Sequence, residues 1–178
     1  MPHRLFIAIR PPEPVRDLLF DAMEGIEGAR WIDEENLHLT LRFVGEVETP
    51  AAEDLAAQLA CIAAAPFPLA LEGVGHFTRK GQATALWARV APSAPLEALR
   101  QKVEGACERA ELGRETRRFT PHVMLARLNR SSGGIGPWLA SFGDLRAQWQ
   151  ADHFTLYESH LGHTGALYET VAAYPLGG

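Results

Sequence analysis

The chain has 178 residues, of which 47% are hydrophobic and 22% are charged, and its net charge is −5 with histidine neutral. This composition is typical of a soluble globular protein, and the length predicts a single domain over residues 1–178. The negative charge excludes a broad electrostatic grip on duplex DNA, so a nucleic acid partner would be met at an end or at a single nucleotide. The apolar run from Leu5 to Ile9 is too short for a signal peptide or a membrane span. We therefore expect a cytoplasmic monomer with no membrane partner.

The hydrophobic pattern predicts the secondary structure in chain order. Thr49-Pro50 and Ser93 are typical helix starts, because Ser and Thr cap the first turn and Pro is tolerated there. Apolar residues at helical spacing predict helices over residues 15–26, 49–65 and 93–112. Strands are expected over residues 4–10, 36–45, 67–74, 83–90, 119–127, 148–158 and 166–174. The order contains two β-α-β units that each end in a strand with a histidine, which predicts an α+β fold of two similar halves.

The two histidine strands share a local pattern. Residues 36–45 read Asn-Leu-His-Leu-Thr-Leu-Arg-Phe-Val-Gly, with apolar and polar side chains in alternation. Because successive side chains of a strand point to opposite faces, His38, Thr40 and Arg42 are expected to share one face. Residues 119–127 repeat the pattern with His122, and 84 residues separate the two histidines. The repeat predicts that each half contributes one histidine to a shared cleft.

Two facing histidines are suited to acid–base catalysis at phosphorus. An unperturbed imidazole has a pKa of about 6.5, so one ring can accept a proton while the other donates one near neutral pH. Thr40 would donate a hydrogen bond to a non-bridging phosphate oxygen, and a nearby arginine would stabilise the charge that develops in the transition state. This scheme uses neither a metal nor a cofactor.

Three further side chains are candidates for substrate binding. Strict alternation places Arg42 beside His38, but it places Arg127 on the face opposite His122 unless a β-bulge intervenes. Phe77 lies beside a polar turn and is the better candidate to stack on a base, whereas Phe43 is predicted in the core. The basic segment at residues 114–118 could steer RNA phosphates, although such charge runs are commonly solvated.

A metal site and an ordinary structural role are the alternatives for the histidines. Neither histidine strand contains a His-x-His pair or an acidic residue, and His160 and His163 lie beside a glycine turn where they are expected to be solvated. A lone strand histidine is more often structural, and the repeat is what favours a catalytic role. Cys61 and Cys107 lack CxxC spacing and are expected as buried thiols, with a disulfide between them as the alternative.

The ordered set of motifs resembles the 2H phosphoesterase superfamily and, within it, the bacterial RNA 2′,3′-cyclic phosphodiesterases, historically called 2′-5′ RNA ligases. The resemblance extends over nearly the whole chain and is carried by residues 4–9, 36–46, 86–88, 119–127 and 154–159. It implies a bilobal, duplicated α+β fold in which two antiparallel sheets flank a central cleft.

The resemblance also implies an activity, which is metal-independent hydrolysis of a 2′,3′-cyclic phosphate at an RNA 3′ end, or in a cyclic nucleotide, to a 2′-phosphomonoester. His38 would protonate the departing 3′ oxygen, and His122 would accept the proton of the attacking water. The family has Thr or Ser where this chain has Met124, which cannot donate a hydrogen bond to phosphate. Two alternatives stay open: a 2′-5′ RNA ligase acting on tRNA halves, and a catalytically silent RNA- or nucleotide-binding module.

Overall fold

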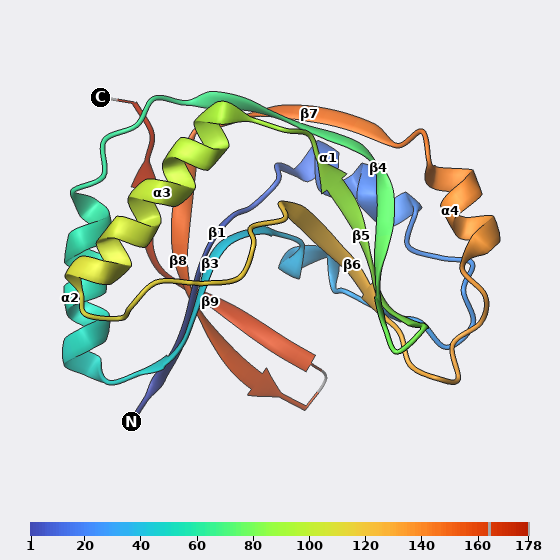
Figure 1. The fold of residues 1–178 in the computed structure, drawn as a ribbon, viewed down its shortest axis with the longest axis horizontal. Coiled ribbons are helices and arrows are strands. Elements are labelled where there is room, and N and C mark those ends of the chain that lie inside the picture. Colours follow the sequence, from blue (N-terminus) through green and yellow to red (C-terminus); the bar gives the residue numbers. More distant parts are fainter. Residues whose placement is uncertain (164, 178) are drawn as a thin grey trace.

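The computed structural model describes residues 1–163 and 165–177 and has the predicted α+β composition (Figure 1). The strands are β1 (His3–Ile9), β2 (Arg30–Trp31), β3 (Leu39–Val47), β4 (Phe67–Arg79), β5 (Gln82–Val90), β6 (His122–Arg127), β7 (Arg146–Ala151), β8 (His153–Gly162) and β9 (Gly165–Pro175). The helices are α1 (Glu13–Asp21), α2 (Thr49–Ala60), α3 (Ala94–Arg109) and α4 (Gly136–Phe142), with a 3-10 helix, η1 (Glu34–Asn36).

The strands form one antiparallel sheet in the order β7-β4-β5-β6-β3-β1-β8-β9, with β2 paired to β6. We call β1, β3, β8 and β9 the β1 half, and β2, β4, β5, β6 and β7 the β6 half. The halves meet where the two histidine strands pair at Leu39 and Val123. The prediction of two separate sheets is therefore wrong, because these strands hydrogen bond to each other and make the sheet continuous.

The chain passes from β7, the first strand in this sheet order, to β8, the next to last, through a single residue. The sequence predicts one strand over residues 148–158, but β7 ends at Ala151 beside β4, and β8 begins at His153 and pairs with β1 and β9. Only Asp152 lies between them, so the sheet must curve for its two ends to approach each other (Figure 1). The pattern of the stretch is typical of a strand throughout, which is why the sequence does not reveal the change of partner.

The helices cover the sheet and close a single core. The α3 cap is as predicted, since Ser93 Oγ accepts a hydrogen bond from the Leu96 amide at 3.2 Å. Helices α2 and α3 pack together and against β1, β3, β4 and β9, while α1 packs on β7 and α4 on β4. Helix α4 was not predicted, because its seven residues are too few to establish a helical period. Among residues 1–163 and 165–177, no helix combines the length and the hydrophobicity that crossing a membrane requires.

Candidate active site

The two histidines sit in identical local frames at the junction of the halves. His38 Nδ1 lies 2.7 Å from the Asn36 carbonyl oxygen, and His122 Nδ1 lies 2.6 Å from the Thr120 carbonyl oxygen. A carbonyl oxygen only accepts, so each Nδ1 carries a proton. In each neutral ring the lone pair is therefore on Nε2, which leaves that nitrogen free for a ligand.

Both rings line one pocket of about 570 Å³, which we call the histidine pocket. Its walls come from β1, β3, β6 and the β8–β9 hairpin. Its ionisable and hydroxyl-bearing side chains are those of Arg4, His38, Thr40, His122, Arg127, Ser159 and Tyr168. The structure thus brings His38, Thr40 and His122 together, as the alternation of the two strands predicts.

A β-bulge in β3 removes Arg42 from this pocket. Thr40 pairs with Ala8 and Arg42 pairs with Ile7, so Leu41 is an extra residue that shifts the alternation by one. Arg42 is consequently buried, and its Nη1 donates to Glu104 Oε2 on α3 at 2.6 Å. The prediction that Arg42 shares a face with His38 is wrong for this reason, and Phe43, predicted in the core, lines the pocket instead.

A matching bulge in β6 brings Arg127 into the histidine pocket. Trp87 pairs with Met124 and Leu86 pairs with Ala126, so Leu125 is the extra residue. The sequence leaves open whether a bulge intervenes between His122 and Arg127. The bulge at Leu125 turns Arg127 to the face of His122 and Met124. Both strands therefore have the bulge three residues after the histidine, which makes Phe43, rather than Arg42, the positional counterpart of Arg127.

Phe77 contacts the His122 ring but does not line the histidine pocket. Its ring centroid is 5.1 Å from that of His122 in an edge-to-face arrangement, and it also contacts Trp87. It lines a second pocket of about 320 Å³, the Phe77 pocket, which shares Thr40, Phe43 and His122 with the histidine pocket. The two pockets are thus contiguous at the catalytic candidates, and Phe77 belongs to the second.

The basic segment before β6 is largely neutralised by acidic neighbours. Arg114 pairs with Glu108 at 2.6 Å, and Arg117 pairs with Glu115 at 3.0 Å. Hydrogen bonds from Arg117 lower the pKa of Glu115 to about 2. These pairs reduce the charge that the segment can offer to a phosphate, as expected for exposed charges held by their neighbours.

Several residues of the histidine pocket were not predicted, among them Arg4, Phe6 and Tyr168. Arg4 and Phe6 alternate along β1 and point into the pocket, and Tyr168 reaches it from β9. Arg4 also lies over the Phe43 ring, with its guanidinium carbon 5.4 Å from the ring centroid. The alternation of Arg4 with apolar neighbours is a signal that could have identified it, whereas nothing in the sequence of β9 marks Tyr168.

The surroundings of His38 favour its neutral form. Its ring packs against Phe6 and Tyr168, with centroids 4.9 and 5.4 Å away. Burial among these rings lowers the pKa of His38, and the nearby His122 adds to this effect, while the bond to the Asn36 carbonyl opposes it. Burial also raises the pKa of Tyr168, against the positive charges of Arg127 and Arg4, so both guanidinium groups act on its hydroxyl.

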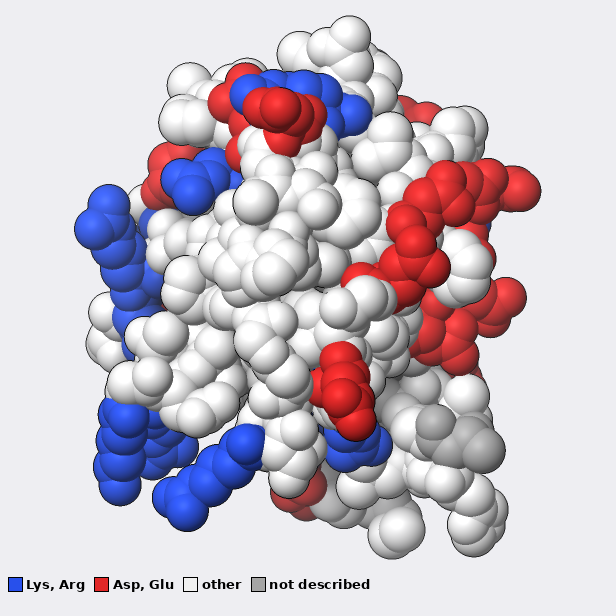
Figure 2. All heavy atoms as spheres, turned by 90° about the vertical axis from the view of Figure 1, so that its right-hand side faces the viewer, with Lys and Arg blue, Asp and Glu red and all other residues white. Residues whose placement is uncertain are grey.

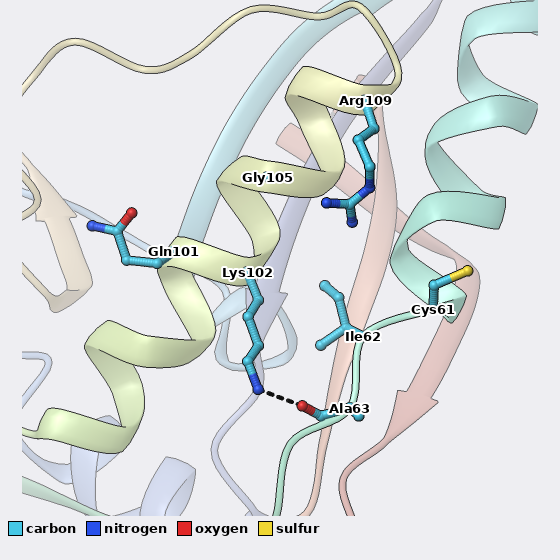
Figure 3. A pocket seen from close by; sticks show the side chains of 7 residues that line it. All are labelled: Cys61, Ile62, Ala63, Gln101, Lys102, Gly105 and Arg109. Carbon is cyan, nitrogen blue, oxygen red and sulfur yellow. Dashed lines mark hydrogen bonds between the residues drawn. The ribbon is translucent and has the colours of Figure 1, made fainter.

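A pocket between α2 and α3 offers no comparable chemistry. The pocket has a volume of about 440 Å³ and is lined by Cys61, Ile62, Ala63, Gln101, Lys102, Gly105 and Arg109. In Figure 3 the side chains of Lys102, Arg109 and Ile62 lie between the two segments, whereas the Gln101 side chain and the Cys61 thiol point away from them. Lys102 already donates to the Ala63 carbonyl, and Arg109 donates to Gln58 Oε1 at 2.8 Å. Cys61 is exposed here, contrary to its prediction as a buried thiol, while Cys107 is buried and both thiols are free.

The side of the molecule that carries α4 separates its charges. In Figure 2 many of the Lys and Arg side chains lie on the left and lower left, many of the Asp and Glu side chains lie on the right, an uncharged surface lies between them, and both kinds meet at the top. A duplex would meet acidic as well as basic groups on this side, which agrees with the overall charge of −5.

Comparison with known proteins decides the family. A family model described as the 2′-5′ RNA ligase superfamily matches residues 11–163. The chain belongs to the 2′-5′ RNA ligase superfamily. The family predicted from the two histidine motifs is thereby confirmed.

Curated members of the superfamily resemble the chain along most of its length. The RNA 2′,3′-cyclic phosphodiesterase of Geobacillus stearothermophilus is 33% identical over 159 residues, which are 88% of this chain and 50% of that protein. The chain thus spans half the length of that relative. The protein of the same name from Aeropyrum pernix is 32% identical over 144 residues, which are 79% of this chain and 82% of its own.

Solved structures of the superfamily share the α+β fold. The Escherichia coli LigT structure in complex with 3′-AMP has a TM-score of 0.80 and 25% identity, and it covers 99% of both chains. The LigT complex with ATP has a TM-score of 0.78 at the same identity and coverage. The predicted fold class is confirmed at this level.

Proposed function

We propose that this protein is an RNA 2′,3′-cyclic phosphodiesterase that converts a terminal cyclic phosphate to a 2′-phosphomonoester through His38 and His122. The observation that carries the proposal is the shared frame of the two rings, each held through Nδ1 and each lining the histidine pocket. A pair held in this way offers one Nε2 to accept a proton and one to donate it. The activity of the curated relatives supports the assignment.

The reaction requires one proton transfer on each side of phosphorus. His122 Nε2 accepts the proton of a water molecule as its oxygen attacks the phosphorus. The bond from phosphorus to the 3′ oxygen breaks, and His38 Nε2 donates the proton that this oxygen takes up. The product has a 2′-phosphate and a free 3′ hydroxyl, and the two histidines have exchanged protonation states.

Phosphate binding in this scheme depends on Thr40, Arg127 and Tyr168. Thr40 supplies one hydroxyl donor, and Arg127 faces the same pocket because of the Leu125 bulge. Tyr168 places a second hydroxyl under the influence of Arg127 and Arg4, and it supplies the donor that Met124 lacks. Because these donors line a pocket of limited size, they act on the developing charge more strongly than they would in water.

The low pKa of His38 gives substrate binding a further role. In the free protein, burial and His122 favour the neutral ring, which cannot protonate a leaving oxygen. A bound phosphodiester brings a negative charge into the same pocket, and an opposite charge within a few ångströms raises an imidazole pKa. Substrate binding therefore promotes the protonated form of His38 that the reaction uses.

The test is hydrolysis of a 2′,3′-cyclic nucleotide in excess EDTA, with the product identified by phosphorus NMR. We expect a 2′-phosphate from the wild type and a loss of about 10²–10⁴-fold in each of His38→Ala and His122→Ala, as for other general acids and bases. His153→Ala is the matched control, since this histidine is exposed and pairs with Asp152. Turnover that persists in both variants would contradict the two-histidine mechanism.

A second substrate is needed to test which histidine acts as the general acid and which acts as the general base. A p-nitrophenyl phosphodiester has a leaving group that departs without a proton, so the general acid contributes little to its hydrolysis. We expect His38→Ala to lose much less activity on this ester than on the cyclic nucleotide, while His122→Ala loses activity on both. The opposite pattern would assign the acid role to His122.

The same assays separate the remaining functions. Met124 is the observation that favours a binding module, because it removes a donor from the phosphate site. Binding of the cyclic nucleotide without turnover, unchanged in His38→Ala, would support that function. Joining of tRNA halves through a 2′-5′ bond, with little hydrolysis, would support a ligase.

A further inference from the structure

The outer face of the β8–β9 hairpin carries two opposed carboxylates. Glu158 on β8 pairs directly with Glu169 on β9 in the sheet register. Like charges directly opposite each other destabilise an antiparallel pair, so this arrangement calls for a compensating positive charge. His160 lies two residues beyond Glu158 and therefore shares its face.

These three side chains are close enough to share one cation. One ligand atom from each of Glu158, His160 and Glu169 lies within 4.8 Å of the others, and His160 Nε2 is 3.8 Å from Glu169 Oε2. Zinc takes imidazole nitrogen and carboxylate oxygen at about 2.0–2.2 Å. The His160 and Glu169 side chains are 47% and 69% exposed, so they are free to make the small movement that closes this distance.

His3 forms a hydrogen bond with Glu158, the least exposed member of the cluster. Its Nδ1 lies 2.9 Å from Glu158 Oε2, and its Nε2 lies 2.9 Å from Thr49 Oγ1 at the start of α2. The Glu158 side chain is 16% exposed, and within residues 1–163 and 165–177 its Oε1 makes no hydrogen bond. A histidine that orients a ligating carboxylate in this way typically strengthens metal binding.

We propose that Glu158, His160 and Glu169 form a binding site for a divalent transition-metal cation of the zinc class. The mixed nitrogen and oxygen donors favour such a cation over magnesium or calcium, which prefer oxygen alone. Water completes the coordination. The cation neutralises the opposed carboxylates and ties β8 to β9.

The site lies behind one wall of the histidine pocket. Ser159 and Tyr168 pair across the same two strands and face the pocket, and each is a chain neighbour of a proposed ligand. A cation on the outer face would therefore order the wall that carries Tyr168. This consequence rests on the proposed function, whereas the metal site itself does not.

The test is a calorimetric titration of metal-free full-length protein with zinc chloride. The titration uses His38→Ala/His122→Ala protein, so that the paired imidazoles of the pocket do not compete for zinc. We expect one zinc per chain, with affinity at least about tenfold weaker in His160→Ala, in Glu169→Gln and in His3→Ala, as for changes in and around other metal sites. His153→Ala is the matched control, because it removes another exposed histidine beside a carboxylate, and it should bind zinc normally.

Three results would overturn the proposal. They are the absence of zinc binding, binding that survives both His160→Ala and Glu169→Gln, and binding lost equally in His153→Ala. The protein with its catalytic histidines intact then tests the effect on the pocket. Zinc should slow amide exchange in β8 and β9 and lower KM without raising kcat, and neither effect should occur in His160→Ala. Failure of the phosphodiesterase assay would leave the titration and the exchange result interpretable.

Discussion

Met124 makes the two sides of the histidine pocket chemically unequal. It takes on β6 the place that Thr40 takes on β3, two residues after the histidine and on the same face. A thioether is only a weak acceptor, so this side of the pocket offers no hydroxyl donor at that position. In the proposed mechanism, phosphate binding on this side therefore relies on Arg127 and Tyr168.

Met124→Thr is expected to raise kcat for a 2′,3′-cyclic nucleotide. The new hydroxyl adds a donor where charge develops, and one such donor contributes up to about 10²–10³ in kcat in comparable sites. Steady-state kinetics of Met124→Thr against Met124→Leu, which is similar in size and has no donor, isolates the hydrogen bond from the change in volume. Equal rates in these two variants, together with loss of activity in Thr40→Ala, would show that the second side needs no hydroxyl.

His38 should make the stability of the fold depend on pH. Because the folded-state pKa of His38 is lowered, the unfolded chain takes up a proton at a higher pH than the folded chain does. The free energy of unfolding should therefore fall as pH drops below about 6.5, the ordinary imidazole pKa, until the folded-state pKa is reached. Urea unfolding of wild type and His38→Gln from pH 8 to 5 tests this, with His153→Gln as the control. The decrease should be smaller in His38→Gln alone.

At the scale of the elements, the two bulges decide which arginine lines the histidine pocket. The alternation of residues 36–45 and 119–127 correctly places His38, Thr40 and His122, because each precedes its bulge. Beyond Leu41 and Leu125 the alternation shifts by one, and no residue type in either strand marks the shift. The bulges arise from how each strand pairs with its neighbour, which the local pattern does not contain.

We therefore expect Arg42→Ala to lower the stability of the protein and Arg127→Ala to lower its activity. Arg42 is buried, donates to Glu104, and so ties β3 to α3, and Glu104 also accepts from the Glu115 amide at 3.1 Å. Removing one partner of a buried ion pair costs about 3–5 kcal/mol of stability. Arg127 is exposed in the pocket, so its removal should leave stability nearly unchanged and lower kcat by about 10²-fold.

Urea unfolding and steady-state kinetics on both variants provide the test. The residual activity per folded Arg42→Ala molecule should stay near that of the wild type. A stable but inactive Arg42→Ala variant, or an unstable Arg127→Ala variant, would contradict a structural role for Arg42 and a role in the histidine pocket for Arg127.

At the scale of the whole molecule, the sequence repeat is confined to the two histidine strands, whereas the sheet and the core are shared by both halves. The sequence predicts the two similar halves from His38 and His122, and the shared Nδ1 bonds and bulges extend the likeness. It does not predict that Leu39 and Val123 join the halves into one sheet, nor that residues 148–158 divide between β7 in one half and β8 in the other. Both features depend on contacts between segments far apart in the chain, which a periodic pattern cannot specify.

The shared sheet and core should make the halves unfold as one unit. All four tryptophans lie in the β6 half or on α4, and they report on that side alone: Trp31, Trp87, Trp138 and Trp149. The two longest helices, α2 and α3, pack mainly on the β1 half and dominate the helical circular dichroism. Because one buried cluster includes residues of both halves, the fluorescence and dichroism transitions in urea should coincide.

Leu39→Ala sharpens this last prediction because Leu39 is fully buried at the junction itself. Truncating a buried leucine costs about 2–5 kcal/mol, so both transitions should move to lower urea by the same amount. Leu167→Ala, at an exposed position on β9, is the control and should move neither. If the dichroism transition moved while the fluorescence transition stayed, the halves would be separately stable, and the pairing of the histidine strands would position the two imidazole rings without holding the molecule together.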